Sequence, residues 1–265
     1  MRATCKLLAG LAALILVAFG MKSPVADGAD PRDQLQKRVY RDAGGESIPY
    51  RLLVPANYDP QKKYPLILFL HGAGERGDNN EAQLVHAQVL RLATDEARPA
   101  FLVAPQCPRG SKWVEVSWNF KTPHGTPKEP STPMRLTLEL LDALDKEFSI
   151  DPDRRYVTGL SMGGFGTFDA LVRRPDYFAA GIPICGGADD SRAKDIAHIA
   201  CWVFHGSADG AVPVVRSRTA VEALKKAGGK PKYTEYEGLG HFVWGKAYEE
   251  PELLDWLLGQ RRRSP

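Results

Sequence analysis

The chain has 265 residues, which suits one large α/β domain and is too short for two full domains. Its apolar content of 43% and charged content of 25% are ordinary for a globular protein and exclude a fibrous or largely disordered chain. The formal net charge of only +3 argues against an extended basic surface, and therefore against a nucleic-acid partner.

The first 28 residues are predicted to be a secretory signal peptide. Two basic residues precede the apolar run Leu7–Phe19, whose helical length of about 20 Å falls short of the ~30 Å hydrocarbon core of a bilayer. Small residues follow, and cleavage after Gly20 or after Gly28 fits the pattern; an uncleaved anchor is the alternative. We expect a secreted or periplasmic protein whose mature part, 29–265, is a single domain without stable membrane association.

Apolar runs alternate with amphipathic stretches along the remaining chain. The predicted strands are Gln36–Arg41, Ile48–Val54, Leu66–Leu70, Ala100–Ala104, Arg155–Thr158, Ala180–Ile184, Trp202–Phe204 and Lys232–Tyr236. The predicted helices are Ala82–Ala93, Met134–Phe148, Met162–Arg173, Val214–Ala227 and Pro251–Leu258. This alternation predicts an α/β fold with a doubly wound, mostly parallel sheet of about eight strands. The first two strands, joined by 42–45, are expected to form an antiparallel hairpin at the sheet edge.

The segment 105–133 interrupts this alternation. It contains six prolines and three large aromatic residues, and it offers no helical or strand pattern. Long irregular loops of this kind are often lids or binding loops, although a solvated excursion held down by its aromatic residues is equally compatible. We expect an irregular, lid-like loop here.

Three cysteines follow the predicted signal peptide. Cys185 comes after one predicted strand and Cys201 begins the next, so in parallel strands their sulfur atoms would lie at opposite ends. A disulfide between these two is not expected, and the state of Cys107 is left open.

The most informative motif is Gly-x-Ser-x-Gly at Gly159–Gly163, which lies between a predicted strand and a predicted helix. Glycines on both sides allow the sharp strand-to-helix turn that exposes the Oγ of Ser161 as a nucleophile. The backbone N–H of Met162, at the start of the helix, is then a candidate oxyanion donor. The segment His71–Gly74 follows the most apolar strand, and the N–H of Ala73 is the candidate second donor.

Two further strand ends carry the side chains that serine chemistry needs. Asp209, in the sequence His-Gly-Ser-Ala-Asp, could accept the Nδ1–H of a catalytic imidazole; Asp189, Asp190 and Glu237 are weaker competitors. His241 follows two glycines after the last strand and is the candidate base. The other histidines are given no such role, because two lie in strand-end turns and three have no recognisable partner: His71, His205, His86, His124 and His198.

Together these motifs resemble the α/β-hydrolase superfamily, and within it exported esterases and predicted peptidases of the feruloyl-esterase and polyhydroxyalkanoate-depolymerase type. The shared segments are His71–Gly77, Ala104–Pro108, Gly159–Gly164, His205–Asp209 and Gly240–His241. The resemblance implies the α/β-hydrolase fold, in which the nucleophile, acid and base follow in the order Ser161, Asp209, His241.

The activity expected from this resemblance is serine carboxylesterase chemistry through an acyl-enzyme. No metal-ligand spacing occurs, and neither a metal nor another cofactor is expected. Aromatic residues near the motifs, chiefly Trp118, Phe242 and Trp244, are candidates for binding feruloyl, acetyl or polymer-linked esters, either small molecules or decorated polysaccharides and polyesters. The alternatives are a serine peptidase resembling the prolyl oligopeptidase group, and a non-catalytic binding protein that kept the fold.

Overall fold

The computed structural model describes residues 30–262. The predicted signal peptide and both possible cleavage sites lie outside this part of the chain. No helix among the described residues has the length and apolar character needed to span a bilayer.

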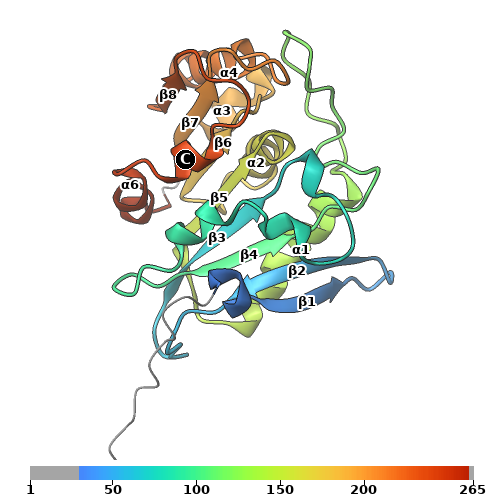
Figure 1. The fold of residues 1–265 in the computed structure, drawn as a ribbon, viewed down its shortest axis with the longest axis vertical. Helices are drawn as coiled ribbons and strands as arrows, with labels where there is room; N and C mark the ends of the chain where they lie inside the picture. Colours follow the sequence, from blue (N-terminus) through green and yellow to red (C-terminus); the bar gives the residue numbers. More distant parts are fainter. Residues whose placement is uncertain (1–29, 263–265) are drawn as a thin grey trace, which may run out of the picture. The chain divides into compact units, whose positions relative to one another are not determined.

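The core of the described chain is one eight-stranded sheet with the spatial order β1-β2-β4-β3-β5-β6-β7-β8 (Figure 1). Its strands are β1 (Gln36–Arg41), β2 (Ser47–Leu53), β3 (Tyr64–Leu70), β4 (Phe101–Pro105), β5 (Ile150–Leu160), β6 (Ala180–Ile184), β7 (Ala200–Gly206) and β8 (Lys232–Tyr236). β2 is antiparallel to both β1 and β4, and the remaining neighbours are parallel. The expected α/β-hydrolase sheet, with its antiparallel hairpin at one edge, is confirmed.

The central strands are apolar along their whole length because both faces of the sheet are covered. In β3 every residue is buried, and successive side chains enter different cores. Leu66, Leu68 and Leu70 face the core that includes the helices α1 (Thr132–Glu147), α2 (Met162–Arg173) and α4 (Val215–Lys226). Ile67 and Phe69 face the other core, which is closed by η4 (Ala87–Leu92), α5 (Trp244–Tyr248) and α6 (Leu253–Gly259).

Helices cover the two faces of the sheet. The main α-helices are α1 (Thr132–Glu147), α2 (Met162–Arg173), α4 (Val215–Lys226), α5 (Trp244–Tyr248) and α6 (Leu253–Gly259). The other helical segments are η1 (Pro31–Gln34), η2 (Ala73–Glu75), η3 (Ala82–Leu84), η4 (Ala87–Leu92), η5 (Asp190–Arg192) and α3 (Ala193–Ile196). Helix α1 begins two residues before the predicted Met134, at a serine cap in which the Ser131 side chain accepts the N–H of Met134.

The predicted helix Ala82–Ala93 is wrong. The chain forms two 3₁₀ segments instead, η3 and η4, which are separated at His86. The Asn79 side chain accepts the N–H groups of Glu81 and Ala82, and His86 adopts φ −93° and ψ 68°, outside the helical region. The apolar residues have helical spacing, but the backbone leaves the helical region at His86 and divides the segment.

The loop between β4 and α1 is irregular, as predicted, and is attached to the body of the domain by polar contacts. Arg216, on α4 and only 1% exposed, donates to the carbonyl of Phe120 and contacts the ring of His124. The N–H of Thr126 donates to Asp189 at 2.6 Å, and the Trp113 indole donates to the carbonyl of His71 at 2.9 Å. The loop is therefore held at several points along its length.

The three cysteines of the described chain are free and buried. Cys107, whose state was open from the sequence, is also unpaired.

Candidate active site

Ser161 sits on a sharp turn between β5 and α2. Its φ of 54° and ψ of −118° lie in a region that a non-glycine residue rarely occupies. The turn requires the flanking glycines: a Cβ on Gly159 would lie 2.4 Å from the carbonyl oxygen of Gly163, and one on Gly163 would lie 1.8 Å from that of Leu70. The motif thus forces the backbone into the conformation that presents the Oγ atom.

The structure brings the side chains of Ser161, His241 and Asp209 together. The Oγ of Ser161 lies 2.9 Å from Nε2 of His241, and Nδ1 of the same ring lies 2.6 Å from an Asp209 carboxylate oxygen. Three strand ends supply them, since Ser161 follows β5, Asp209 follows β7 and His241 follows β8. The Ser161–His241 contact is short enough for Oγ to pass its proton to Nε2, and the His241–Asp209 contact orients the ring.

The Asp209 carboxylate is an anion held inside the protein. Its side chain is fully buried, which on its own would raise its pKa. Hydrogen bonds from His205, His241 and the Val212 amide outweigh burial, and the pKa of this carboxyl is lowered well below its ordinary value. The amide of Ala211 donates to the same oxygen as that of Val212. Asp209 therefore stays charged at neutral pH and accepts the hydrogen bond from Nδ1 of His241.

A second histidine contacts the same carboxylate. Nε2 of the fully buried His205 lies 3.1 Å from Asp209 and 3.0 Å from the carbonyl oxygen of Val212. Both neighbours are acceptors, so this nitrogen carries a hydrogen. Cys185 completes the cluster by donating its S–H to the carbonyl of His241. The sulfur, an imidazole nitrogen and a carboxylate oxygen lie within 4.8 Å of one another. As hydrogen-bonded here, the thiol and Nε2 of His205 carry protons where a metal ion would need lone pairs.

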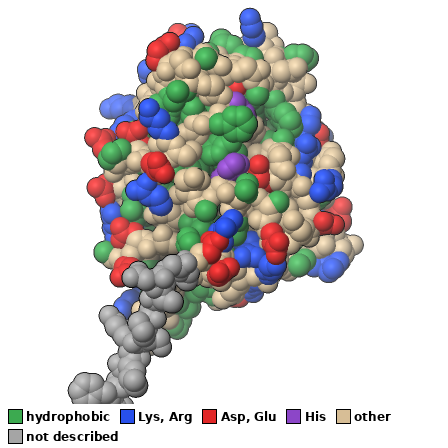
Figure 2. Space-filling view, in the orientation of Figure 1, with side chains coloured by type: hydrophobic (Ala, Val, Ile, Leu, Met, Phe, Trp, Pro, Cys, Tyr) green, Lys and Arg blue, Asp and Glu red, His purple; other side chains and the backbone are tan. Residues whose placement is uncertain are grey.

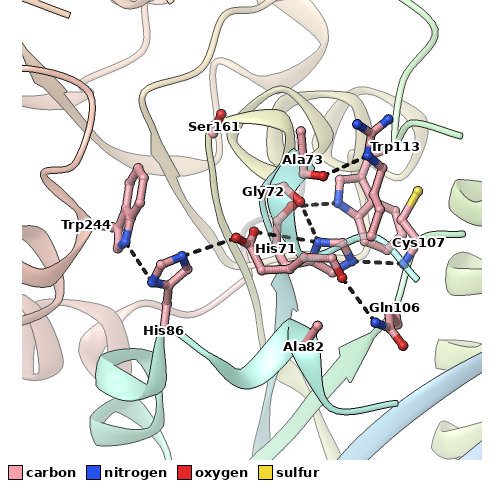
Figure 3. A network of polar contacts seen from close by, with 12 residues as sticks. His71, Gly72, Ala73, Ala82, His86, Gln106, Cys107, Trp113, Ser161 and Trp244 are labelled. Carbon is pink, nitrogen blue, oxygen red and sulfur yellow. Dashed lines mark hydrogen bonds and ion pairs between the residues drawn. The ribbon is translucent and has the colours of Figure 1, made fainter. Parts of the chain in front are cut away.

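The two candidate oxyanion donors lie at the ends of neighbouring strands. Met162 is the first residue of α2 and Ala73 is the first residue of η2, which follows β3, so neither N–H has an acceptor within its own helix. His71 stabilises the loop that carries Ala73, because its Nδ1 donates a hydrogen bond to the carbonyl of Gly72 at 2.6 Å. Burial lowers the pKa of His71 to about 4, so this support is an uncharged imidazole. Figure 3 shows Gly72 and Ala73 between His71 and Ser161.

The three aromatic residues proposed to bind substrate differ in their exposure. Phe242 is 84% exposed and lies beside His241, with ring centroids 5.8 Å apart. Trp244 is only 7% exposed, and its indole N–H donates to His86. Trp118 is half-buried on the loop 105–133, beneath the ammonium group of Lys112. Phe242 is thus the most accessible of the three. Figure 2 shows hydrophobic side chains gathered next to the histidines of the face in view.

Three histidines judged to lack partners do have them, so this expectation is wrong. His86 bonds to Trp244 and lies 3.3 Å from Glu75, His124 contacts Arg216, and His198 contacts the carbonyl of Pro175. Most of these partners are tens of residues away along the chain, and spacing within the sequence gave no signal for them.

A family model described as "Putative esterase" matches residues 42–193, which is more than half of the chain. The chain belongs to this esterase family. Membership confirms the expected resemblance and makes the protein a serine ester hydrolase with the α/β-hydrolase fold.

Individual relatives agree with the family. The chain is 28% identical over 215 residues to "Probable carboxylesterase SOBER1-like" of Arabidopsis thaliana, covering 75% of this chain and 79% of that protein. It is 26% identical to "Bifunctional acetylxylan esterase/xylanase XynS20E" of Neocallimastix patriciarum, over 64% of this chain and 22% of that one. A solved structure titled "Crystal Structure of a Thermostable Esterase" superposes with a TM-score of 0.80 at 41% identity. The superposition covers 87% of this chain and 64% of the other.

Proposed function

We propose that this esterase acts through a Ser161–His241–Asp209 triad. The observation that supports it is the unbroken series of hydrogen bonds from the Ser161 hydroxyl through His241 to a buried carboxylate. His241 takes the Ser161 proton as Oγ attacks the ester carbonyl, and the same proton then leaves with the alcohol. Water, deprotonated by His241, attacks the acyl-enzyme and releases the acid.

The negative charge on the tetrahedral intermediate is received by the backbone N–H groups of Ala73 and Met162. Loss of one such donor typically costs about 2.7–4 kcal/mol of transition-state stabilisation. Asp209 holds the imidazole in the tautomer that leaves Nε2 free to accept the Ser161 proton, and it stabilises the imidazolium that forms.

The substrates we propose are esters of aromatic or short acyl groups, including those attached to plant polysaccharides. The exposed Phe242 ring beside His241 provides a flat apolar surface for such a group. The similarity to a protein named as an acetylxylan esterase favours a polysaccharide-linked ester over a simple lipid ester.

The test is a comparison of wild type with Ser161→Ala on p-nitrophenyl acetate, methyl ferulate, acetylated xylan and a peptide nitroanilide. We expect ester hydrolysis to fall by at least about 1000-fold in the variant. Covalent labelling by a fluorophosphonate should be lost as well. Persistent labelling of Ser161→Ala, or faster cleavage of the peptide amide than of any ester by wild type, would refute the proposal.

We also propose that the protein works outside the cytoplasm. The support is the order of charged, apolar and small residues in the first 28 positions. Sequencing the amino terminus of the exported protein would show whether the chain has been cut after Gly20 or Gly28, and an intact amino terminus in the cytoplasmic fraction would exclude this location.

A further inference from the structure

Glu75, His86 and Trp244 form a series of polar contacts, and Figure 3 shows its His86 and Trp244 members on the same side of the site as Ser161. The indole N–H of Trp244 donates to Nδ1 of His86 at 3.1 Å, and Nε2 of His86 lies 3.3 Å from Oε1 of Glu75. Glu75 belongs to η2, in the loop with Ala73, whereas Trp244 begins α5, three residues after His241. The series therefore links the oxyanion loop to the loop of the catalytic histidine.

Each bond in this series has one possible direction. An indole nitrogen can only donate, so Nδ1 of His86 must accept. A neutral imidazole then carries its hydrogen on Nε2, which faces the Glu75 carboxylate and donates to it. The contact with His86 helps keep the pKa of Glu75 below its ordinary value, although burial acts the other way. Trp244 and His86 are thus oriented by a carboxylate, as His241 is by Asp209.

The Trp244 ring is the part of this series that touches the catalytic histidine. It meets the His241 ring nearly perpendicularly, at 87° with centroids 5.5 Å apart, and it meets the His86 ring at 5.0 Å. Phe242 packs on its other side at 4.9 Å. Since the indole is 7% exposed and its N–H is bonded, it can rotate little, and it restricts the tilt of the His241 ring.

Glu75 is fixed firmly to the oxyanion loop. Its backbone carbonyl accepts a hydrogen bond from the Gln106 side chain at 3.1 Å. Its second carboxylate oxygen is buried, has no hydrogen-bond partner among the described residues, and lies 2.9 Å from where a Cβ on Gly72 would be. The same hypothetical Cβ would lie 3.6 Å from the Cβ of Ser161. The carboxylate therefore packs directly under the loop, close to the nucleophile.

We propose that Glu75, His86 and Trp244 are positioning residues. They fix the His241 ring relative to the loop that carries the Ala73 N–H. This inference rests on the proposed function, in which His241 and the N–H of Ala73 act on the same carbonyl group. The three residues do not contact the substrate carbonyl in this scheme. Their loss should slow acylation, because a misplaced base can cost up to about 100-fold in rate, while substrate binding is little changed.

The variants Trp244→Phe, His86→Asn and Glu75→Leu each break one link. Phenylalanine keeps a ring but loses the N–H, and asparagine keeps an acceptor for Trp244 but cannot reach Glu75. We expect kcat on p-nitrophenyl acetate to fall about 10-fold in each, with KM within about twofold and fluorophosphonate labelling slowed to the same extent. Glu75→Gln, which retains an acceptor for His86, should restore most of the activity lost in Glu75→Leu.

A double-mutant cycle gives the sharper criterion. If the three residues act as one series, Trp244→Phe combined with Glu75→Leu should be no slower than the worse single variant. Trp256→Phe, on α6, is the matched control and should keep wild-type kcat. Thermal melting of every variant identifies those that fail to fold; should Glu75→Leu be among them, Trp244→Phe combined with His86→Asn forms the cycle.

Wild-type kcat in the folded single variants would overturn this inference. So would a fold-loss of kcat in the double variant equal to the product of the two single losses. A rise in KM at constant kcat would also overturn it, because that pattern belongs to substrate-binding residues. These results are distinguishable from failure of the proposed triad, which would appear as activity and labelling retained in Ser161→Ala.

Discussion

At the scale of single residues, Ser161 combines a reactive position with an unfavourable backbone. A residue with a Cβ in the conformation φ 54°, ψ −118° costs of order 1–3 kcal/mol, whereas glycine adopts it easily. We therefore predict that Ser161→Gly is more stable than Ser161→Ala by about 1 kcal/mol or more. Urea unfolding of both variants measures this difference, and equal midpoints would show that the turn is relaxed.

The residues of the proposed triad could be predicted because each has a local signal. Ser161, Asp209 and His241 all lie beside glycines at the ends of predicted strands, where parallel strands bring their carboxyl ends together. Glu75 and His86 have no such signal. Trp244, one of the two partners of His86, is 158 residues away, and their contact depends on how two loops pack together.

At the scale of elements, predictions succeeded where burial dominates. The unbroken apolar run Leu66–Leu70 predicted a strand covered on both faces, and β3 is such a strand. The amphipathic run Ala82–Ala93 predicted a helix, but the backbone leaves the helical region at His86, whose side chain contacts Trp244. Competition from polar side chains is invisible to a count of apolar spacing.

The loop 105–133 depends on Arg216 for its attachment to α4. The guanidinium donates to the carbonyl of Phe120, contacts His124 and lies over the Phe165 ring at 5.2 Å. Lysine cannot reproduce this forked geometry, so Arg216→Lys should release the loop. We predict faster trypsin cleavage after the exposed Lys121 and Lys128, measured by mass spectrometry of timed digests.

The control for this experiment is Arg218→Lys on the same helix. Arg218 is exposed and pairs with Glu235 on β8, away from the loop contacts of Arg216. Its digestion should match wild type. Equal cleavage in Arg216→Lys and wild type would mean that Asp189 and Trp113 suffice to hold the loop.

At the scale of the whole molecule, the reactivity of three buried thiols indicates whether the fold is intact. These are the thiols of Cys107, Cys185 and Cys201. Burial raises the pKa of Cys107 and of Cys201 to about 12, and it raises that of Cys185 as well. In a Cys5→Ser variant we predict that these three thiols react with Ellman's reagent only after denaturation. A thiol that reacts rapidly in the native enzyme would indicate local opening of the sheet or of the site.

The order of the strands also helps to explain how the protein avoids edge-to-edge aggregation of its sheet with that of a neighbouring molecule. The open edges belong to β1 and β8, and each of these strands carries charged residues, including Lys37 and Arg41 on β1 and Lys232 on β8. Adding a strand from a neighbouring molecule would bring like charges together and strip their hydration, which disfavours edge-to-edge aggregation. The apolar strands most prone to amyloid-like pairing are kept in the middle, where both of their edges are already occupied.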